Sequence, residues 1–436
     1  GTTTTTDEYS LTDKCPAGCV HEYSGTLTHT ISVMGGKHKI IFNGVTIDCT
    51  NTTDFPENQD PKAPALQIIS NKQNDSNSEV ELELRGNNKL KSKDGYAGIR
   101  VTTNNILKIT GIGNLEVHGG STGAGIGNQG VDGNSGDITL ETTGRIDAYG
   151  GAAAAGIGGG QGGGCGTITV KKGTVYAYGG DGYLVDENTP RIGAGTGIGT
   201  GGKASGGGLL VLEGGEIHAE GGWDNKALPE NERKQRNGIE CTKIDSKNGS
   251  VDIYSNSPIS EEDVDIKLFN GIVWTPAGTN KWMGMVYGDA ILKTDLDKKS
   301  LILRDDSSIT IPDEIDEVIL NGGTISGDDS TSIINADKLT VRSGDLIGDI
   351  KKKVTLAFKH FTIEDSPTFT GKRLNPTLSN INEKLDVYAY TIASTEKKDE
   401  DIYEVDTTGW TVNFMRSQTS KPETEINNAG DYKVTY

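Results

Sequence analysis

The chain has 436 residues, 61 of them glycine, with a formal net charge of −19 and only 33 % hydrophobic residues. The negative charge argues against a nucleic-acid partner, because phosphate binding needs clustered Lys and Arg side chains. No apolar run is long enough to cross a bilayer, so we expect no insertion into a membrane. The glycines fall at fixed places between short alternating segments, which indicates ordered tight turns rather than disorder.

The N-terminal part of the chain is predicted to lead into a stack of short strands. Residues 40–48 fit a first coil, and residues 80–84 and 89–93 fit two strands of a later coil. Residues 1–24 are expected to form an N-terminal cap, because the open end of such a stack must be covered to prevent edge pairing.

The cysteines of the chain differ in their surroundings. Cys15 and Cys19 are close enough to form a disulfide across a small loop, and no second pair completes a zinc site beside them. Cys49 and Cys241 follow apolar positions of predicted strands, so we expect both to be buried free thiols. The sequence gives Cys165, which lies in a glycine loop, no role.

Between residues 114 and 222 the chain repeats itself. Each repeat carries a Gly-Ile pair, then a second apolar segment, then a phrase that ends in Gly-Gly. The Gly-Gly phrases lie at 114–120, 145–151, 174–180 and 216–222. Alternation within each segment is typical of half-buried strands, and repetition at this distance indicates a solenoid in which equivalent positions become neighbours.

These repeats predict an all-β chain. Residues 25–256 are expected to form a right-handed parallel β-helix with three short strands per coil. The uneven spacing of the repeats confines insertions to turns, at residues 181–191 and 223–236. The glycine loops stop after residue 254 while short strands continue, so residues 257–355 are predicted to be an irregular β-solenoid extension.

The repeats resemble those of a known class of bacterial protein. The phrase AGIGGGQGGGCGTITV at residues 155–170, followed by GTVYAYGG at residues 173–180, resembles the glycine-rich repeats of bacterial surface proteins. The N-terminal half is similar to the carbohydrate-binding β-helix proteins of Gram-positive bacteria. This resemblance implies an extracellular protein, secreted or attached to the cell wall, that is a monomer within a larger surface polypeptide.

The C-terminal part has a second resemblance. PTFTGKRLNP at residues 367–376 and NAGDYKVTY at residues 428–436 resemble bacterial immunoglobulin-like surface modules. Phe369 stands where those modules usually have Tyr. The resemblance implies a small Ig-like β-sandwich at residues 356–436.

Stacking the repeats predicts two columns of outward side chains, with neighbours about 4.8 Å apart. One column is Lys91, Glu116, Asp147, Tyr176 and His218, and the other is Lys93, His118, Tyr149, Tyr178 and Glu220. Tyrosine rings stack on sugar faces, while carboxylates and imidazoles bind hydroxyl groups, so the columns predict a binding face for a polysaccharide or a host or plant glycan. Trp223, in a turn insertion, adds a further ring for a sugar. The same columns also stabilise a solenoid without binding anything, so a purely structural surface stalk is an alternative.

A polysaccharide lyase or glycosidase is the other alternative. A glycosidase needs two carboxylates about 5–9.5 Å apart, and Glu116 and Asp147 on adjacent strands meet the shorter distance. No substrate cleft or known lyase phrase accompanies them, so we predict a non-catalytic binding or adhesion protein with no catalytic residues. No cofactor is expected, although loop carboxylates could hold a Ca²⁺ ion. These candidates are Asp132, Asp137, Asp181 and Asp186.

Overall fold

A computed structural model of the chain describes residues 3–5, 10–12, 19–50, 64–130, 133–184, 192–204, 207–225, 229, 232–260, 262, 264–293, 296–304 and 307–310, and beyond these only the backbone of the strands between residues 318 and 435. The chain divides into two compact units, Gly1–Leu268 and Phe269–Tyr436. The described residues are all-β and contain no α-helix. None of their segments is a helix long and apolar enough to cross a membrane.

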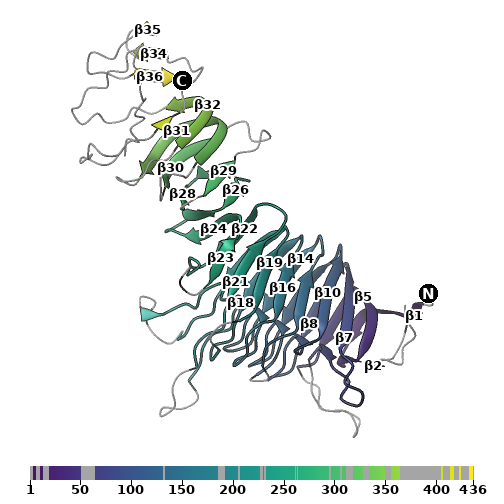
Figure 1. The fold of residues 1–436 in the computed structure, drawn as a ribbon. Helices are drawn as coiled ribbons and strands as arrows, with labels where there is room; N and C mark the ends of the chain where they lie inside the picture. Colours follow the sequence, from purple (N-terminus) through teal and green to yellow (C-terminus); the bar gives the residue numbers. More distant parts are fainter. Residues whose placement is uncertain are drawn as a thin grey trace. The chain divides into compact units, whose positions relative to one another are not determined.

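In the first unit the strands form three rows, and every pairing within a row is parallel (Figure 1). The first row is β2 (Ser10–Thr12), β4 (Ile31–Met34), β6 (Leu66–Ile69), β9 (Ile99–Val101), β12 (Ile126–Gly127), β15 (Ile157–Gly158) and β18 (Ile198–Gly199). The second row is β3 (Val20–Leu27), β5 (Gly36–Asp48), β7 (Ser78–Arg85), β10 (Ile106–Gly111), β13 (Asp137–Leu140), β16 (Thr167–Val170), β19 (Leu209–Leu212), β21 (Lys243–Ser246) and β23 (Asp265–Leu268).

The third row is β8 (Asn87–Lys91), β11 (Asn114–His118), β14 (Arg145–Tyr149), β17 (Thr174–Tyr178), β20 (Glu216–Glu220) and β22 (Val251–Ser255). The long strand β5 pairs with both β7 and β8 and so joins the second and third rows. Each strand pairs with the equivalent strands of the repeats before and after it, an arrangement compatible with a β-helix.

The parallel rows begin inside the predicted cap and continue past residue 256. Strand β3 pairs with β5 from Val20 onward, and β1 (Thr3–Thr5) pairs with β3. At the other end β23 still pairs with β21, and the first unit ends at Leu268. The stacked strands therefore extend further in both directions than the 25–256 boundaries that the glycine phrases suggest.

Alternation in the third row puts apolar side chains inside. The inward positions of the repeats are buried, as predicted: Leu115, Val117, Ile146, Ala148, Val175, Ala177, Ile217 and Ala219. Each Leu, Ile or Val among them stabilises the fold by about 1.5–3 kcal/mol through removal of apolar surface from water.

The Gly-Gly turns that follow these strands stack even more closely. A methyl group on Gly180 would lie 1.6 Å from the carbonyl oxygen of Gly151, one repeat earlier. A methyl group on Gly151 would lie at the same distance from the oxygen of Gly120. Backbone oxygens cannot yield as a flexible side chain would, so close stacking is what requires glycine here.

The predicted register is wrong at the first strand of the third row. Glu116 pairs with Lys89 and His118 pairs with Lys91, whereas Lys91 and Lys93 were the expected partners. The true register therefore differs from the predicted one by two residues.

Asn88 is the physical reason for this displacement, because it occupies the inward position opposite Leu115 where the repeats hold an apolar residue. Asn88 is 3 % exposed, and its amide replaces apolar packing with hydrogen bonds. Its Oδ1 accepts from the N–H of Val45 at 2.9 Å, and its Nδ2 donates to the carbonyl of Asn114 at 3.1 Å.

The second unit begins with an antiparallel hairpin of β24 (Gly271–Pro276) and β25 (Trp282–Tyr287). Trp274 on this hairpin is fully buried, and the ammonium of Lys299 lies 5.2 Å from its ring centroid. Parallel pairing then resumes through the strands β26 (Asp289–Ile291), β27 (Leu296–Asp297), β28 (Lys299–Leu303), β29 (Ser308–Thr310), β30 (Val318–Gly327), β31 (Ile333–Gly348) and β32 (Thr355–Ile363). Parallel strands therefore follow the hairpin, and the β-solenoid extension at residues 257–355 stays a prediction.

The region predicted to be Ig-like, residues 356–436, is described only by strand backbones. Besides β32 these are β33 (Glu404–Val405), β34 (Asn413–Arg416), β35 (Pro422–Glu423) and β36 (Tyr432–Thr435). Strand β36 pairs antiparallel with β34 and β32, whereas β33 pairs parallel with β32. The Ig-like sandwich stays a prediction.

Candidate functional site

Two columns of outward side chains cross the third row of strands, and we call this surface the outer face. The pairings of β11, β14, β17 and β20 confirm both predicted columns from Glu116 and His118 onward. The structure adds Tyr254 on β22, which pairs with His218. The alternation of Val251–Ser255 carries the signal for Tyr254, although the sequence interpretation missed it.

Aromatic side chains of the outer face form two stacks of parallel rings. In one, the ring of Tyr149 lies between those of His118 and Tyr178, with centroid distances of 4.5 and 4.8 Å. In the other, the ring of His218 lies between those of Tyr176 and Tyr254, at 4.2 and 4.7 Å.

The stacks meet on β17, where the ring centroids of Tyr176 and Tyr178 are 6.4 Å apart. A continuous path of rings therefore crosses the outer face from β11 to β22.

Stacking decides which part of each ring a ligand can reach. Both faces of Tyr149 are covered, by His118 and Tyr178. Both faces of Tyr176 are also covered, by His218 and by the guanidinium of Arg145, whose central carbon lies 3.9 Å from the ring centroid. These rings therefore offer edges and hydroxyl groups to a ligand rather than the open faces that sugar stacking would use.

The phenols of Tyr149, Tyr178 and Tyr254 stay protonated at neutral pH. Burial raises the pKa of Tyr149 and of Tyr178, and it raises the pKa of Tyr254 to about 12. A protonated phenol both donates and accepts hydrogen bonds, which matches the hydroxyl groups of a sugar.

The carboxylates at the N-terminal end of the outer face are held in ion pairs. Lys89 Nζ lies 2.6 Å from Glu116 Oε1, and the Nε2 of His118 lies 2.6 Å from the same oxygen. Asp147 accepts two hydrogen bonds from Arg145, at 2.7 Å from Nε and 2.5 Å from Nη2.

These ion pairs bear on the predicted glycosidase alternative. The hydrogen bond from Lys89, followed by that from His118, lowers the pKa of Glu116 below its usual range. A glycosidase acid needs the opposite shift, because it must carry a proton at the working pH. Glu116 is therefore poorly suited to the acid role.

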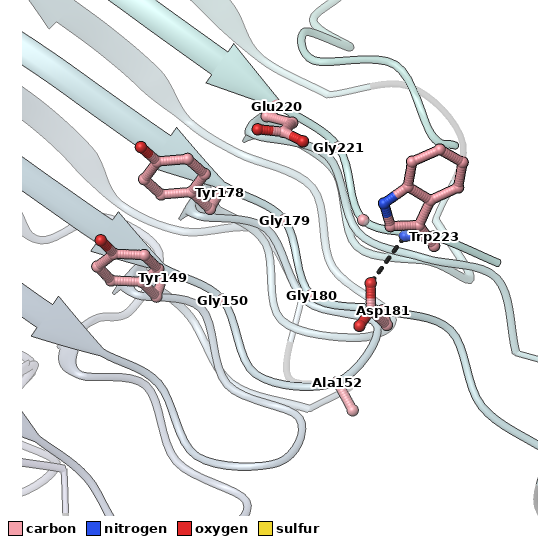
Figure 2. Close-up of a pocket in the computed structure, with 11 residues that line it drawn as sticks. Tyr149, Gly150, Ala152, Tyr178, Gly179, Gly180, Asp181, Glu220, Gly221 and Trp223 are labelled. Carbon is pink, nitrogen blue, oxygen red and sulfur yellow. Dashed lines mark hydrogen bonds between the residues drawn. The ribbon is translucent and has the colours of Figure 1, made fainter. Parts of the chain in front are cut away.

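A pocket of about 450 Å³ opens beside the second column, where β14, β17 and β20 end (Figure 2). Tyr149 and Tyr178 stand on one side of it, and Trp223 stands across the Gly-Gly turns from them. The remaining lining residues are Gly150, Ala152, Gly179, Gly180, Asp181, Glu220, Gly221 and Gly222. The glycines that close stacking requires therefore also leave the floor of the pocket without side chains.

Trp223 is held in place by its backbone. Its N–H donates to Oδ1 of Asp181 at 2.9 Å, as Figure 2 shows, and it forms an antiparallel bridge with Gln235. Gln235 Nε2 in turn donates to Oε1 of Glu220 at 2.9 Å. The turn insertion that begins at Trp223 is thereby tied to both carboxylates of the pocket. Trp223 itself is half-buried.

The structure thus separates the predicted face into a pocket and a flanking surface. Tyr149, Tyr178, Glu220 and Trp223 line the pocket, and so does Asp181, a predicted Ca²⁺ candidate. The other predicted residues lie on the outer face beyond the pocket lining: Glu116, His118, Asp147, Tyr176 and His218. Ala152 and the glycine floor were not predicted as parts of a site.

The Ca²⁺ candidates do not gather in the described part of the chain, where no group of three or more His, Cys, Asp and Glu side chains could hold a metal. Asp137 Oδ1 accepts from the N–H of Thr167 at 2.9 Å. Asp132 and Asp186 lie outside the described residues, so a Ca²⁺ ion stays a prediction.

Cys49 and Cys241 are buried free thiols, as predicted. Cys165 is also buried and free, and its thiol lies against that of Cys241. Cys19 is a free cysteine in the structure, whereas Cys15 lies outside the described residues, so the Cys15–Cys19 disulfide stays a prediction.

Comparison of the chain with protein-family models, curated proteins and solved structures finds no match.

Proposed function

We propose that this chain is a non-catalytic, extracellular bacterial surface protein that binds carbohydrate. In this proposal the first unit is a right-handed parallel β-helix, and the pocket beside Tyr149, Tyr178 and Trp223 is the binding site. An Ig-like module at residues 356–436 would serve as a spacer in a larger polypeptide.

The pocket carries this proposal, because it combines apolar and polar groups as sugar sites do. Aromatic side chains line it from two sides: the Trp223 ring can pack against the apolar face of a sugar, whereas Tyr149 and Tyr178 present ring edges and hydroxyl groups. Phenol hydroxyls and the carboxylates of Asp181 and Glu220 supply partners for sugar hydroxyls. A glycine floor lets the ligand approach the backbone, and the volume of about 450 Å³ lies within the usual range for small-ligand sites.

A glycan array followed by titration calorimetry tests the proposal. The Trp223→Ala variant should lose binding about tenfold or more, because it removes one aromatic wall. Tyr176→Ala is the matched control, since it removes a stacked ring of the same face outside the pocket and should leave affinity within about twofold. Equal losses in both variants, or no glycan bound by the intact chain, would contradict the assignment.

A structural stalk is a second candidate, and the ring stacks favour it. Their ring faces contact one another, which is how stacked side chains stabilise a sheet. If the outer face is structural only, Tyr149→Ala lowers the free energy of unfolding while no glycan binds the intact chain.

A further inference from the structure

The residues that line the pocket come from three successive repeats and occupy equivalent positions in each. One wall is formed by paired neighbours at the ends of β14, β17 and β20: Tyr149, Tyr178 and Glu220. The opposite wall in Figure 2 is formed by the residues that follow the three Gly-Gly pairs: Ala152, Asp181 and Trp223. The pocket therefore crosses three repeats in the direction in which the strands stack.

The repeat of β11 continues both walls and the floor by one further step. His118 pairs with Tyr149, and the two rings stack with their centroids 4.5 Å apart. The N–H of Gly119 donates to the carbonyl of Tyr149 at 2.9 Å, which joins the two Gly-Gly turns. Ser121 is exposed and occupies the position that Ala152 has in the next repeat. The arrangement of the pocket thus extends to a fourth repeat.

The Gly-Gly floor ends on both sides of these four repeats. The positions of the two glycines hold Ser92 and Lys93 after β8, and they hold Ser257 and Pro258 after β22. With paired strands about 4.8 Å apart, the first and the fourth repeat of the floor are about 14 Å apart. The floor is therefore several times longer than the distance between neighbouring strands.

Such repetition suits a ligand that itself consists of repeated units. A chain of sugars that lies along the floor meets one set of equivalent groups after another, whereas a single sugar leaves most of them unused. Ring edges and phenol hydroxyls on the first wall are partners for sugar hydroxyls, and the Trp223 ring is a partner for the face of a sugar. Glycines between the walls let the ligand lie close to the backbone.

We infer that the pocket and the repeat of β11 form one groove, which binds a linear oligosaccharide lengthwise across the stacked strands. This inference rests on the proposed carbohydrate-binding function and names the ligand class of the same site, an extended chain rather than one terminal sugar. Trp223 marks one end of the groove, and Ser121 marks the other.

Titration calorimetry with oligomers of increasing length tests the inference. The probes are linear oligomers of glucose, of N-acetylglucosamine and of galacturonate, each from one to six sugars long. In a series that binds, the affinity should rise at least about tenfold from the monomer to the tetramer, because each added sugar makes further contacts. The affinity should level off once the chain is longer than the groove.

A bulky side chain at the far end of the groove separates long ligands from short ones. Ser121→Phe should weaken binding of the tetramer and of longer oligomers at least about fivefold, because the new ring occupies their path. The dimer should stay within about twofold, since it can bind beside Trp223 without reaching Ser121. Thr143→Phe is the matched control, because it adds the same ring at an exposed turn before β14 and should leave every affinity unchanged. Thermal unfolding shows that both variants are folded.

The outcomes distinguish the groove from the pocket alone. A monomer that binds as tightly as the tetramer overturns the inference while leaving carbohydrate binding in place. Long oligomers whose affinity is unchanged in Ser121→Phe overturn it too, because the chain then does not reach the repeat of β11. Undiminished binding of every length in Trp223→Ala places the ligand elsewhere, so the proposed site and the inference both fail. If no oligomer binds the intact chain, the proposed function fails at this site and the inference fails with it.

Discussion

The phenol rings of Tyr149 and Tyr178 lie parallel, with their centroids 4.8 Å apart. That distance is the spacing of paired strands, so the backbone register alone places one ring on the other. Each ring rests on its neighbour, and the stack therefore has a measurable share in stability.

Replacing a ring in this stack should destabilise the first unit. Tyr178→Ala should lower the free energy of unfolding by about 2 kcal/mol, because Tyr149 loses its stacking partner and a half-buried ring is removed. Tyr178→Phe keeps the ring and should stay within about 0.5 kcal/mol of the wild type. Urea unfolding measures both variants, and an equal cost for Phe and Ala would show that the hydroxyl rather than the ring matters.

A methyl group on the Gly-Gly turn should be costly. In Gly180→Ala the new carbon would lie 1.6 Å from the oxygen of Gly151, so the stacked turns must separate, at a cost of about 3 kcal/mol or more. In the control, Gly193→Ala, the nearest atom is the oxygen of Gly202 at 3.2 Å, and the cost should be below about 1 kcal/mol. Thermal unfolding of the two variants compares them directly, and similar melting temperatures would count against glycine-dependent stacking.

Asn88 should contribute more to stability than its neighbour in sequence. Asn88→Ala leaves the buried N–H of Val45 and the carbonyl of Asn114 without this partner, and we expect a loss of about 3 kcal/mol. Asn87→Ala, at an exposed position, should change the free energy of unfolding by no more than about 0.5 kcal/mol. Chemical denaturation tests the pair, and a small effect at Asn88 would mean that water replaces its amide.

The free energy of unfolding should fall on acidification, because protonation of Glu116 breaks its ion pair with Lys89. The pKa of Glu116 is lowered in the folded chain, so the unfolded chain binds the proton more readily. The contribution of Glu116 is therefore fully present above its ordinary pKa of 4.5 and is lost as the pH falls through the lowered value. Unfolding measured between pH 7 and pH about 3 should be less pH-dependent in Glu116→Gln and in Lys89→Gln than in the wild type. An unaltered pH profile in both variants would exclude the ion pair as its source.

The buried thiols should be unreactive in the folded chain. A hydrogen bond with Cys165, together with burial, holds the pKa of the Cys241 thiol well above its usual range, so little reactive thiolate forms. In a Cys15→Ser, Cys19→Ser background, a thiol reagent should label Cys49, Cys165 and Cys241 only after unfolding. Rapid labelling of the folded chain would show that this part of the core opens readily.

The register of the outer face could be predicted from sequence wherever the inward positions hold Leu, Ile, Val or Ala. Between Glu116 and His218 they do, and both columns are confirmed. The predicted register was wrong at Lys89, because the inward position beside it holds the polar residue Asn88. Asn88 is buried and satisfied by hydrogen bonds, so the apolar alternation that marks inward positions is missing there.

The pocket could not be predicted in the same way. Its floor consists of glycines, whose missing side chains give no chemical signal, and its far wall depends on where a turn insertion places Trp223. That position follows from contacts of Trp223 with Asp181 and Gln235 that no periodicity encodes. The columns predicted that the rings are neighbours, but they did not predict that neighbouring rings and Arg145 cover the ring faces.

Each repeat contributes one Gly-Gly turn to the floor of the pocket, so the length of the floor depends on the number of repeats. Duplication of a single repeat would add one more turn and lengthen the groove by about 4.8 Å, with the existing contacts unchanged. The number of repeats and the insertion at Trp223 are thus independent variables: the number of repeats sets the length of the glycine floor, and the insertion sets the side chains at its end.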